Sequence, residues 1–200
     1  TILNSSFSAN EDLSGNCGAA IVDRGQATIA DSEIVGNIGV CAAVSNMSST
    51  LELVRSTVSG NDGGGLYNST NNVMSVADST VSGNIVGGGI VNFGRLTVTN
   101  STVSGNDSSA STTFPHGGIY NKHTGGTGTN KGVLELINST ISGNVGKVDW
   151  SVFGVYSGLY NEDGLVTVKG SIIDGMCLGP TAPTSVGYNV ESPYSTCVFD

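Results

Sequence analysis

An eleven-residue phrase recurs along almost the whole chain, and its period sets the size of the folding unit. Its most regular copies read MSVADSTVSGN at 74–84 and LTVTNSTVSGN at 96–106. The closing asparagines follow one another at intervals of 27, 24, 23, 22 and 38 residues. They are Asn10, Asn37, Asn61, Asn84, Asn106 and Asn144. A period of this size is typical of solenoids, in which stacked units bury a core that no single unit could form.

The residue types within the phrase predict two short strands with a sharp bend between them. In the 96–106 copy, Leu96 and Val98 alternate with threonines, as in a half-buried strand. The fifth position then carries Asn, Asp or Gly, the residues that best tolerate a left-handed backbone. Arg55 is the exception at this position, and we expect slight strain there.

Three further columns of the phrase have distinct expected roles. The sixth position is serine in every copy, so we expect a small side chain that is hydrogen-bonded to its copies in neighbouring coils. The closing asparagines are expected to stack as an amide ladder. An outward position between them forms a hydroxyl array in four consecutive copies, at Thr57, Thr80, Thr102 and Thr140.

A glycine-rich phrase separates the copies and supplies a third strand to each unit. It reads GGGLYN at 63–68, GGGIVN at 87–92, GGIYN at 117–121 and SGLYN at 157–161. The sequence therefore predicts an all-β fold, a right-handed parallel β-helix in one domain spanning 1–200. We expect about seven coils of roughly 22–24 residues, two of them longer.

Three insertions interrupt the repeat, at 107–116, 122–132 and 145–157. The first and third leave the rod at the same turn of adjacent coils, so they should lie side by side. The second is rich in Gly and Thr and is expected to form a flexible surface loop. The other two supply candidates for binding a glycan or a protein partner, because aromatic side chains clustered on loops serve such contacts. These candidates are Phe114, His116, Trp150, Phe153 and Tyr156. The alternative is that the aromatic side chains fold back and cover the rod.

The four cysteines form two local pairs, one near each end of the chain. Cys17 and Cys41 precede similar apolar positions of consecutive coils, and Cys177 and Cys197 would close a C-terminal segment at 177–200. Two disulfides and an oxidising compartment follow from this pairing, with four free buried thiols as the alternative. No C-x-x-C pair is present, which argues against zinc, and we expect no metal and no cofactor.

Charge and hydropathy exclude two classes of partner. The net charge is −9 and only 7 residues are Lys or Arg, so a nucleic-acid footprint is not expected. No run approaches the length of apolar sequence that spans a membrane as a helix. The sequence begins within repeat-like residues without a recognisable cap, which raises the hypothesis of end-to-end self-association or of adjoining β-helix coils. The alternative is that upstream coils are simply missing.

The phrases NSTVSGN, GGGIVN, GGGLYN and GGIYN resemble those of secreted bacterial right-handed β-helix proteins of the pectin-lyase-like superfamily. Within it they are similar to polymorphic outer-membrane-protein repeats, although a regular FxxN motif is lacking. The ending, with Cys177, SVGYNVES and Cys197, resembles the C-terminal region of choice-of-anchor β-helix proteins. The resemblance implies an extracellular or cell-surface location, and it leaves activity open because the superfamily contains lyases, hydrolases, adhesins and passive surface proteins.

The distribution of acidic residues favours a non-enzymatic role. Glycosidases need paired carboxylates, whereas Glu52 and Glu135 belong to coils far apart, and Asp62 and Asp107 are expected in loops. We therefore expect an extracellular structural or adhesive solenoid that forms filaments if it joins end to end. Two alternatives remain: a carbohydrate-binding or carbohydrate-active β-helix that uses the insertions, and an ice-binding solenoid that uses the threonine array.

Overall fold

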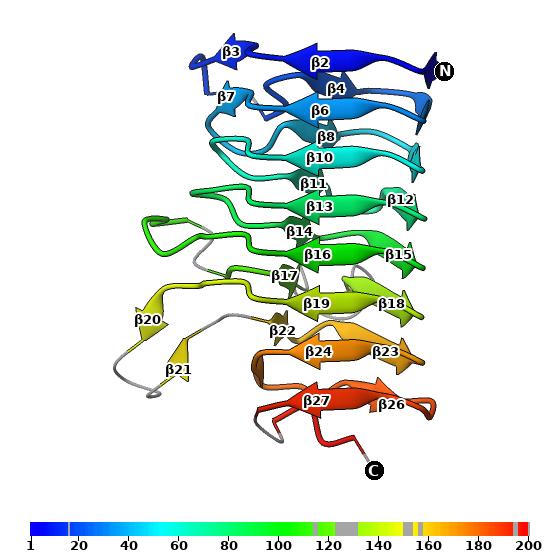
Figure 1. Cartoon of the computed structure of the whole chain (residues 1–200), viewed down its shortest axis with the longest axis vertical. Helices are drawn as coiled ribbons and strands as arrows, with labels where there is room; N and C mark the ends of the chain where they lie inside the picture. The colour runs from blue at the N-terminus through cyan, green and yellow to red at the C-terminus, as the bar shows by residue number, and fades with distance from the viewer. Residues whose placement is uncertain are drawn as a thin grey trace.

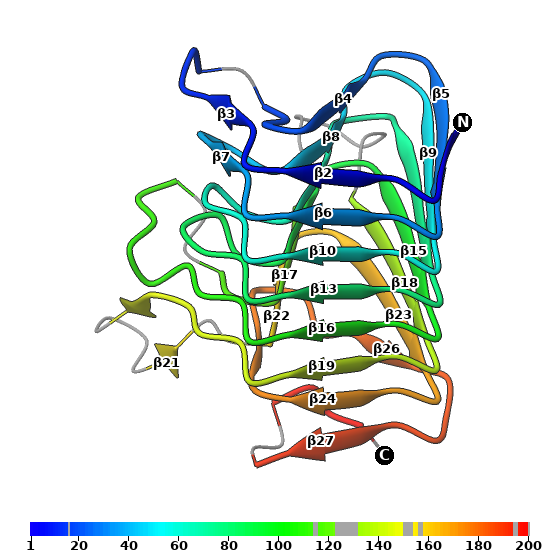
Figure 2. The ribbon, with the colours of Figure 1, turned by 45° about the horizontal axis from the view of Figure 1, so that its top comes forward.

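The computed structural model describes residues 1–15, 17–113, 116–122, 132–149, 154–155, 158–193 and 196–199. These residues wind into a right-handed parallel β-helix, a rod with the N-terminus at one end and the C-terminus at the other (Figure 1). Three parallel sheets run the length of the rod, and Figure 2 shows their coils stacked in chain order. The predicted fold class is therefore confirmed.

Sheet 1 contains the strands that open each phrase, most of them five residues long. Their leucines and valines alternate with polar residues, so one face lies in the core and the other faces solvent. Its strands, in spatial order, are β1 (Ile2–Leu3), β5 (Gln26–Ala30), β9 (Thr50–Val54), β12 (Val73–Ala77), β15 (Arg95–Thr99), β18 (Val133–Ile137), β23 (Leu165–Lys169) and β26 (Thr184–Ser185).

Sheet 2 contains the three-residue strands that follow the bend. Each regular strand reads Thr-Val-Ser or Thr-Ile-Ser, and its middle residue is fully buried. The strands are β2 (Ser6–Ser8), β6 (Glu33–Val35), β10 (Thr57–Ser59), β13 (Thr80–Ser82), β16 (Thr102–Ser104), β19 (Thr140–Ser142), β24 (Ile172–Asp174) and β27 (Val190–Ser192).

Sheet 3 contains the strands of the glycine-rich phrase. The strands are β4 (Ile21–Asp23), β8 (Val44–Asn46), β11 (Leu66–Asn68), β14 (Ile90–Asn92), β17 (Ile119–Lys122), β22 (Leu159–Glu162) and β25 (Cys177–Leu178). The C-terminal segment is closed by the Cys177–Cys197 disulfide and contributes the strands β25, β26 and β27. The described chain thus has eight strands in sheets 1 and 2 and seven in sheet 3.

The core consists of files of like side chains that run along the rod. Val58, Val81 and Val103 stack in sheet 2, and each is fully buried. Leu51, Met74, Leu96 and Leu134 form a corresponding file in sheet 1. Each coil therefore buries its apolar residues only because the next coil covers them.

The bend between sheets 1 and 2 is left-handed in every copy of the phrase. Positive φ angles occur at all seven positions of the column: Asn4, Asp31, Arg55, Asp78, Asn100, Asn138 and Gly170. Arg55 has a φ of 46°, and its guanidinium donates two hydrogen bonds of 2.7 Å to Asp31 in the preceding coil. Arg55, the one residue in the column that is not Asn, Asp or Gly, is therefore hydrogen-bonded to the equivalent residue of the preceding coil.

The insertions at 107–116 and 145–157 leave the rod from neighbouring coils, as expected. Asp107 and Val145 form a parallel bridge, and the Ser108 amide donates to the Val145 carbonyl at 2.8 Å. Both project from the same side of the rod in Figure 1. The later insertion includes a short antiparallel pair, β20 (Val148–Asp149) with β21 (Gly154–Val155). Most of the predicted loop at 122–132 lies outside the described residues.

Two disulfides join the predicted pairs, Cys17 with Cys41 and Cys177 with Cys197. Each has a Cα–Cα distance of 4.8 Å, and they enclose sequence separations of 24 and 20 residues. Disulfides of this kind form and persist in oxidising surroundings. The described part of the chain contains no helix with the length and apolarity needed to cross a membrane.

Candidate functional site

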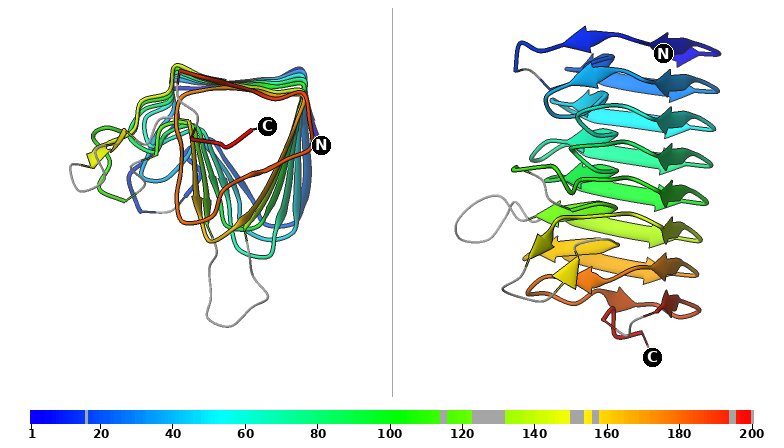
Figure 3. Two further views of the ribbon diagram at one scale, coloured as in Figure 1. Left: turned by 90° about the horizontal axis from the view of Figure 1, so that it is seen from below. Right: turned by 60° about the vertical axis from the view of Figure 1, so that its left-hand side comes forward.

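The outer face of sheet 2 presents two parallel files of hydroxyl groups, which we call the hydroxyl face. Thr57, Thr80, Thr102 and Thr140 stand in register from coil to coil, and Ser59, Ser82, Ser104 and Ser142 stand in register beside them. All eight are half-buried. Seen along the rod, the strands of sheet 2 superpose as one nearly straight side (Figure 3, left). The face is therefore both regular and flat.

A ladder of serines fixes the start of each sheet 2 strand. The Ser56 amide donates to the Ser79 hydroxyl at 3.0 Å, and the Ser79 amide donates to the Ser101 hydroxyl at 3.1 Å. Each hydroxyl in turn donates to the carbonyl two residues before it, as Ser79 does to Ala77 at 2.7 Å. This column carries the predicted hydrogen bonds between copies.

A ladder of asparagines fixes the other end of each strand. The Asn61 side-chain amide donates to the Asn84 side-chain oxygen at 2.8 Å, and Asn84 donates to Asn106 at 2.9 Å. Asn84 also donates to the Val58 carbonyl at 3.1 Å. The ladder runs from Asn10 to Asn144, across both regular and long coils.

The eight hydroxyl groups of the face differ from these ladder residues. Among the described residues, none of the eight has a hydrogen bond from its hydroxyl to another part of the protein. The serine that directly precedes each of these sheet 2 strands is fully hydrogen-bonded, as Ser56 and Ser79 show. The hydrogen-bonding capacity of the face is therefore directed to solvent.

Charge enters the face only at its two ends. Glu33 lies in register with Thr57, and Asp174 lies in register with Ser142. The outward positions of the four coils between them carry only Thr and Ser. A neutral strip therefore runs along a protein whose net charge is −9.

A second group of polar residues lies on the outer side of sheet 3. The His116 ring stacks on Tyr160 with centroids 4.1 Å apart, and it lies 4.3 Å from the Tyr120 ring. The Tyr120 hydroxyl donates to Glu162, which also forms a 3.0 Å ion pair with Lys122. His116 and Tyr120 are both buried. His116 is thus a packed residue of the rod rather than a solvated loop residue.

Burial shifts the pKa values of this group. Loss of solvent lowers the pKa of His116 to about 4, which Glu162 opposes and Lys122 reinforces. Burial and the hydrogen bond with Glu162 both raise the pKa of Tyr120. The imidazole is therefore neutral in the folded protein at physiological pH.

Acidification is expected to destabilise the protein through His116. As the pH falls below 6.5, the unfolded chain binds a proton that the folded imidazole does not accept until about pH 4. The free energy of unfolding should fall by about 3 kcal/mol over this interval from His116 alone and then level off. Urea unfolding at pH 7.5 and pH 4 measures the loss. Between these two pH values, the free energy of unfolding of the variant H116F should fall by about 3 kcal/mol less than that of the wild type. The titration of carboxylates contributes to the fall in both proteins. Parallel losses in the two proteins would contradict the assignment.

The acidic residues considered above as a catalytic pair are widely spaced. Glu52 and Glu135 both lie on the outer side of sheet 1 but are separated by two intervening strands, which places their backbones about 14 Å apart. Asp62 and Asp107 occupy one ladder with Ile85 between them, which places their backbones about 9.6 Å apart. The Asp107 carboxylate already accepts a hydrogen bond from the Ser109 amide at 2.8 Å.

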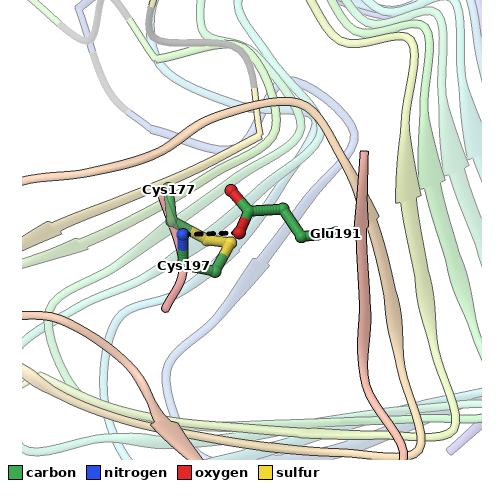
Figure 4. A group of neighbouring side chains, drawn as sticks. All are labelled: Cys177, Glu191 and Cys197. Carbon is green, nitrogen blue, oxygen red and sulfur yellow. Dashed lines mark hydrogen bonds between the residues drawn. A yellow bond between two sulfur atoms is a disulfide. The ribbon is translucent and has the colours of Figure 1, made fainter. Parts of the chain in front are cut away.

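Cys177, Glu191 and Cys197 bring three potential metal donor atoms within 4.8 Å of one another. Figure 4 shows the two sulfurs joined in a disulfide, and the Cys197 amide donating a hydrogen bond to the Glu191 carboxylate. Glu191 also accepts a hydrogen bond from the Thr196 hydroxyl at 2.6 Å. Sulfurs in a disulfide are not thiolate ligands, so in this oxidised state the group secures the C-terminal segment.

The predicted binding residues have different outcomes. The candidates Phe114, Trp150, Phe153 and Tyr156 lie outside the described residues, so their role stays a prediction. His116 is described and is packed against two tyrosine rings, those of Tyr120 and Tyr160.

Sequence reasoning missed a second asparagine ladder, on the inner side of sheet 3. Its side chains are fully buried, and each donates to the next over 2.7–3.0 Å. The ladder consists of Asn46, Asn68, Asn92, Asn121 and Asn161. The signal was present, because each of these residues closes a copy of the second phrase.

Comparison with protein-family models, with curated proteins and with solved structures finds no match to this chain. The function must therefore be argued from the geometry of the rod itself.

Proposed function

We propose that this protein is an extracellular structural or adhesive β-solenoid without catalytic activity. The observation that carries the proposal is the set of three side-chain ladders, one of serine and two of asparagine, that join successive coils. Such ladders hold the coils in fixed register and stiffen the rod. The recurrent polar residues of the repeat thus have a mechanical role.

The two disulfides support the extracellular part of the proposal. They join Cys17 to Cys41 and Cys177 to Cys197, and they link segments that are 24 and 20 residues apart in the sequence. A bridge that closes a loop of this size stabilises by about 3 kcal/mol. A protein that works outside the cell benefits from such covalent cross-links.

Electron microscopy combined with a turnover assay tests this function. We expect stiff rods of uniform width, adhesion of protein-coated beads to cell-surface polymers, and no products from a panel of acidic and neutral polysaccharides. If the rods join end to end, the protein also forms filaments. Release of sugar products that disappears in D62N or D107N would overturn the non-enzymatic assignment, because these two acidic residues lie two strand spacings apart on one ladder.

A further inference from the structure

We propose that the hydroxyl face binds an ordered lattice of water, the surface of an ice crystal. The face repeats in two directions. Neighbouring coils place equivalent hydroxyls about 4.8 Å apart along the rod, and Thr and Ser within one strand stand about 6.6 Å apart. Crystalline ice likewise presents oxygen atoms that repeat in two directions, with spacings of similar size.

The hydroxyl groups are available for this role. The eight groups have no hydrogen-bond partner within the described protein, while the adjacent serine column is fully bonded. Each threonine also carries a methyl group beside its hydroxyl, so the face combines apolar atoms that order water with polar atoms that anchor it.

The face is held rigid, so its hydroxyls stay in register. The serine ladder fixes the residue before each strand, and the asparagine ladder fixes the second residue after it. Between them, the middle residues Val58, Val81, Val103 and Ile141 pack into the core with no exposed area. Hydroxyl groups that are already fixed in position bind a lattice without the entropic cost of ordering them.

The chemistry of the face favours water over other extended surfaces. The outward positions of its four strands carry no charged side chain, which matches an uncharged surface better than an anionic polymer. They also present no aromatic ring on which a sugar could stack. Crystalline polysaccharide is therefore the less suitable partner.

Thermal hysteresis and partition into growing ice test the inference on the intact protein. We expect the wild type to separate freezing from melting temperature and to enter the ice fraction. The variant T102K places a long charged side chain at the middle of the face and should lose most of both effects. The matched control T97K lies in the same coil on the outer side of sheet 1 and should behave as the wild type. Urea unfolding establishes that both variants fold.

Three results would overturn the inference: no hysteresis and no ice uptake by the wild type, equal loss in T97K and T102K, or retention on crystalline cellulose or chitin with none on ice. None of these outcomes alters the mechanical role of the ladders. A failure of ice binding is therefore distinguishable from a failure of the structural function.

Discussion

Replacing Asn84 with alanine is expected to lower the free energy of unfolding by about 5 kcal/mol. Asn84 is fully buried, and its side-chain oxygen accepts hydrogen bonds from both the backbone and side-chain amides of Asn61. Its own amide donates to Asn106 and to the Val58 carbonyl. The substitution leaves two or three buried polar groups without a partner, and each costs about 1–3 kcal/mol.

Asn10 provides a control of the same residue type in the same column. It is exposed, and its side chain only donates to Asn37, at 2.8 Å. The variant N10A should therefore lose about 1 kcal/mol or less. Urea unfolding monitored by circular dichroism measures both. Similar losses for N84A and N10A would show that the ladder stabilises the rod no more at its centre than at its end.

Replacing Gly89 with valine is expected to destabilise the protein by at least about 4 kcal/mol. Even a single Cβ there would lie 2.7 Å from the Gly118 carbonyl oxygen, 2.8 Å from a Val103 methyl and 2.9 Å from the Asn106 side-chain amide. The coils therefore pack too closely around Gly89 for any side chain to fit. The glycine-rich phrase is thus required by the contact between sheet 3 and the asparagine ladder.

Gly25 provides the matched control, because an added Cβ meets nothing within 4 Å and its backbone is not left-handed. The variant G25V should unfold within about 0.5 kcal/mol of the wild type. Thermal and urea unfolding of the two variants measure the difference. A G89V protein as stable as G25V would show that the coils around Gly89 can move apart at little cost, which would contradict the close packing described above.

Much of the fold was predictable from the sequence because the repeat keeps its period. Ser79 and Ser101, or Asn84 and Asn106, fall at fixed offsets from the buried valines, so their stacking follows from pairing of successive coils. The left-handed bend follows in the same way from a column of Asn, Asp and Gly.

The remaining features depend on contacts that no local pattern encodes. His116 lies in a polar insertion, and its burial comes from Tyr120 and Tyr160, which belong to two different coils. Strands β26 and β27 lack the phrase and form because the coil above offers them a paired edge. The hydroxyl face was visible as a pattern, but its lack of internal partners required the structure.

The asparagine ladder also has a consequence for how such a chain can evolve. Each rung joins a residue to its own copy in the next coil, so the ladder has no preferred length. The rung between Asn106 and Asn144 spans 38 residues of sequence and is as short, at 2.8 Å, as the rung that spans 23. Duplication of one coil, or growth of a loop after an asparagine, leaves every other rung intact. New loops can therefore be acquired and selected on this rod without redesign of its interior.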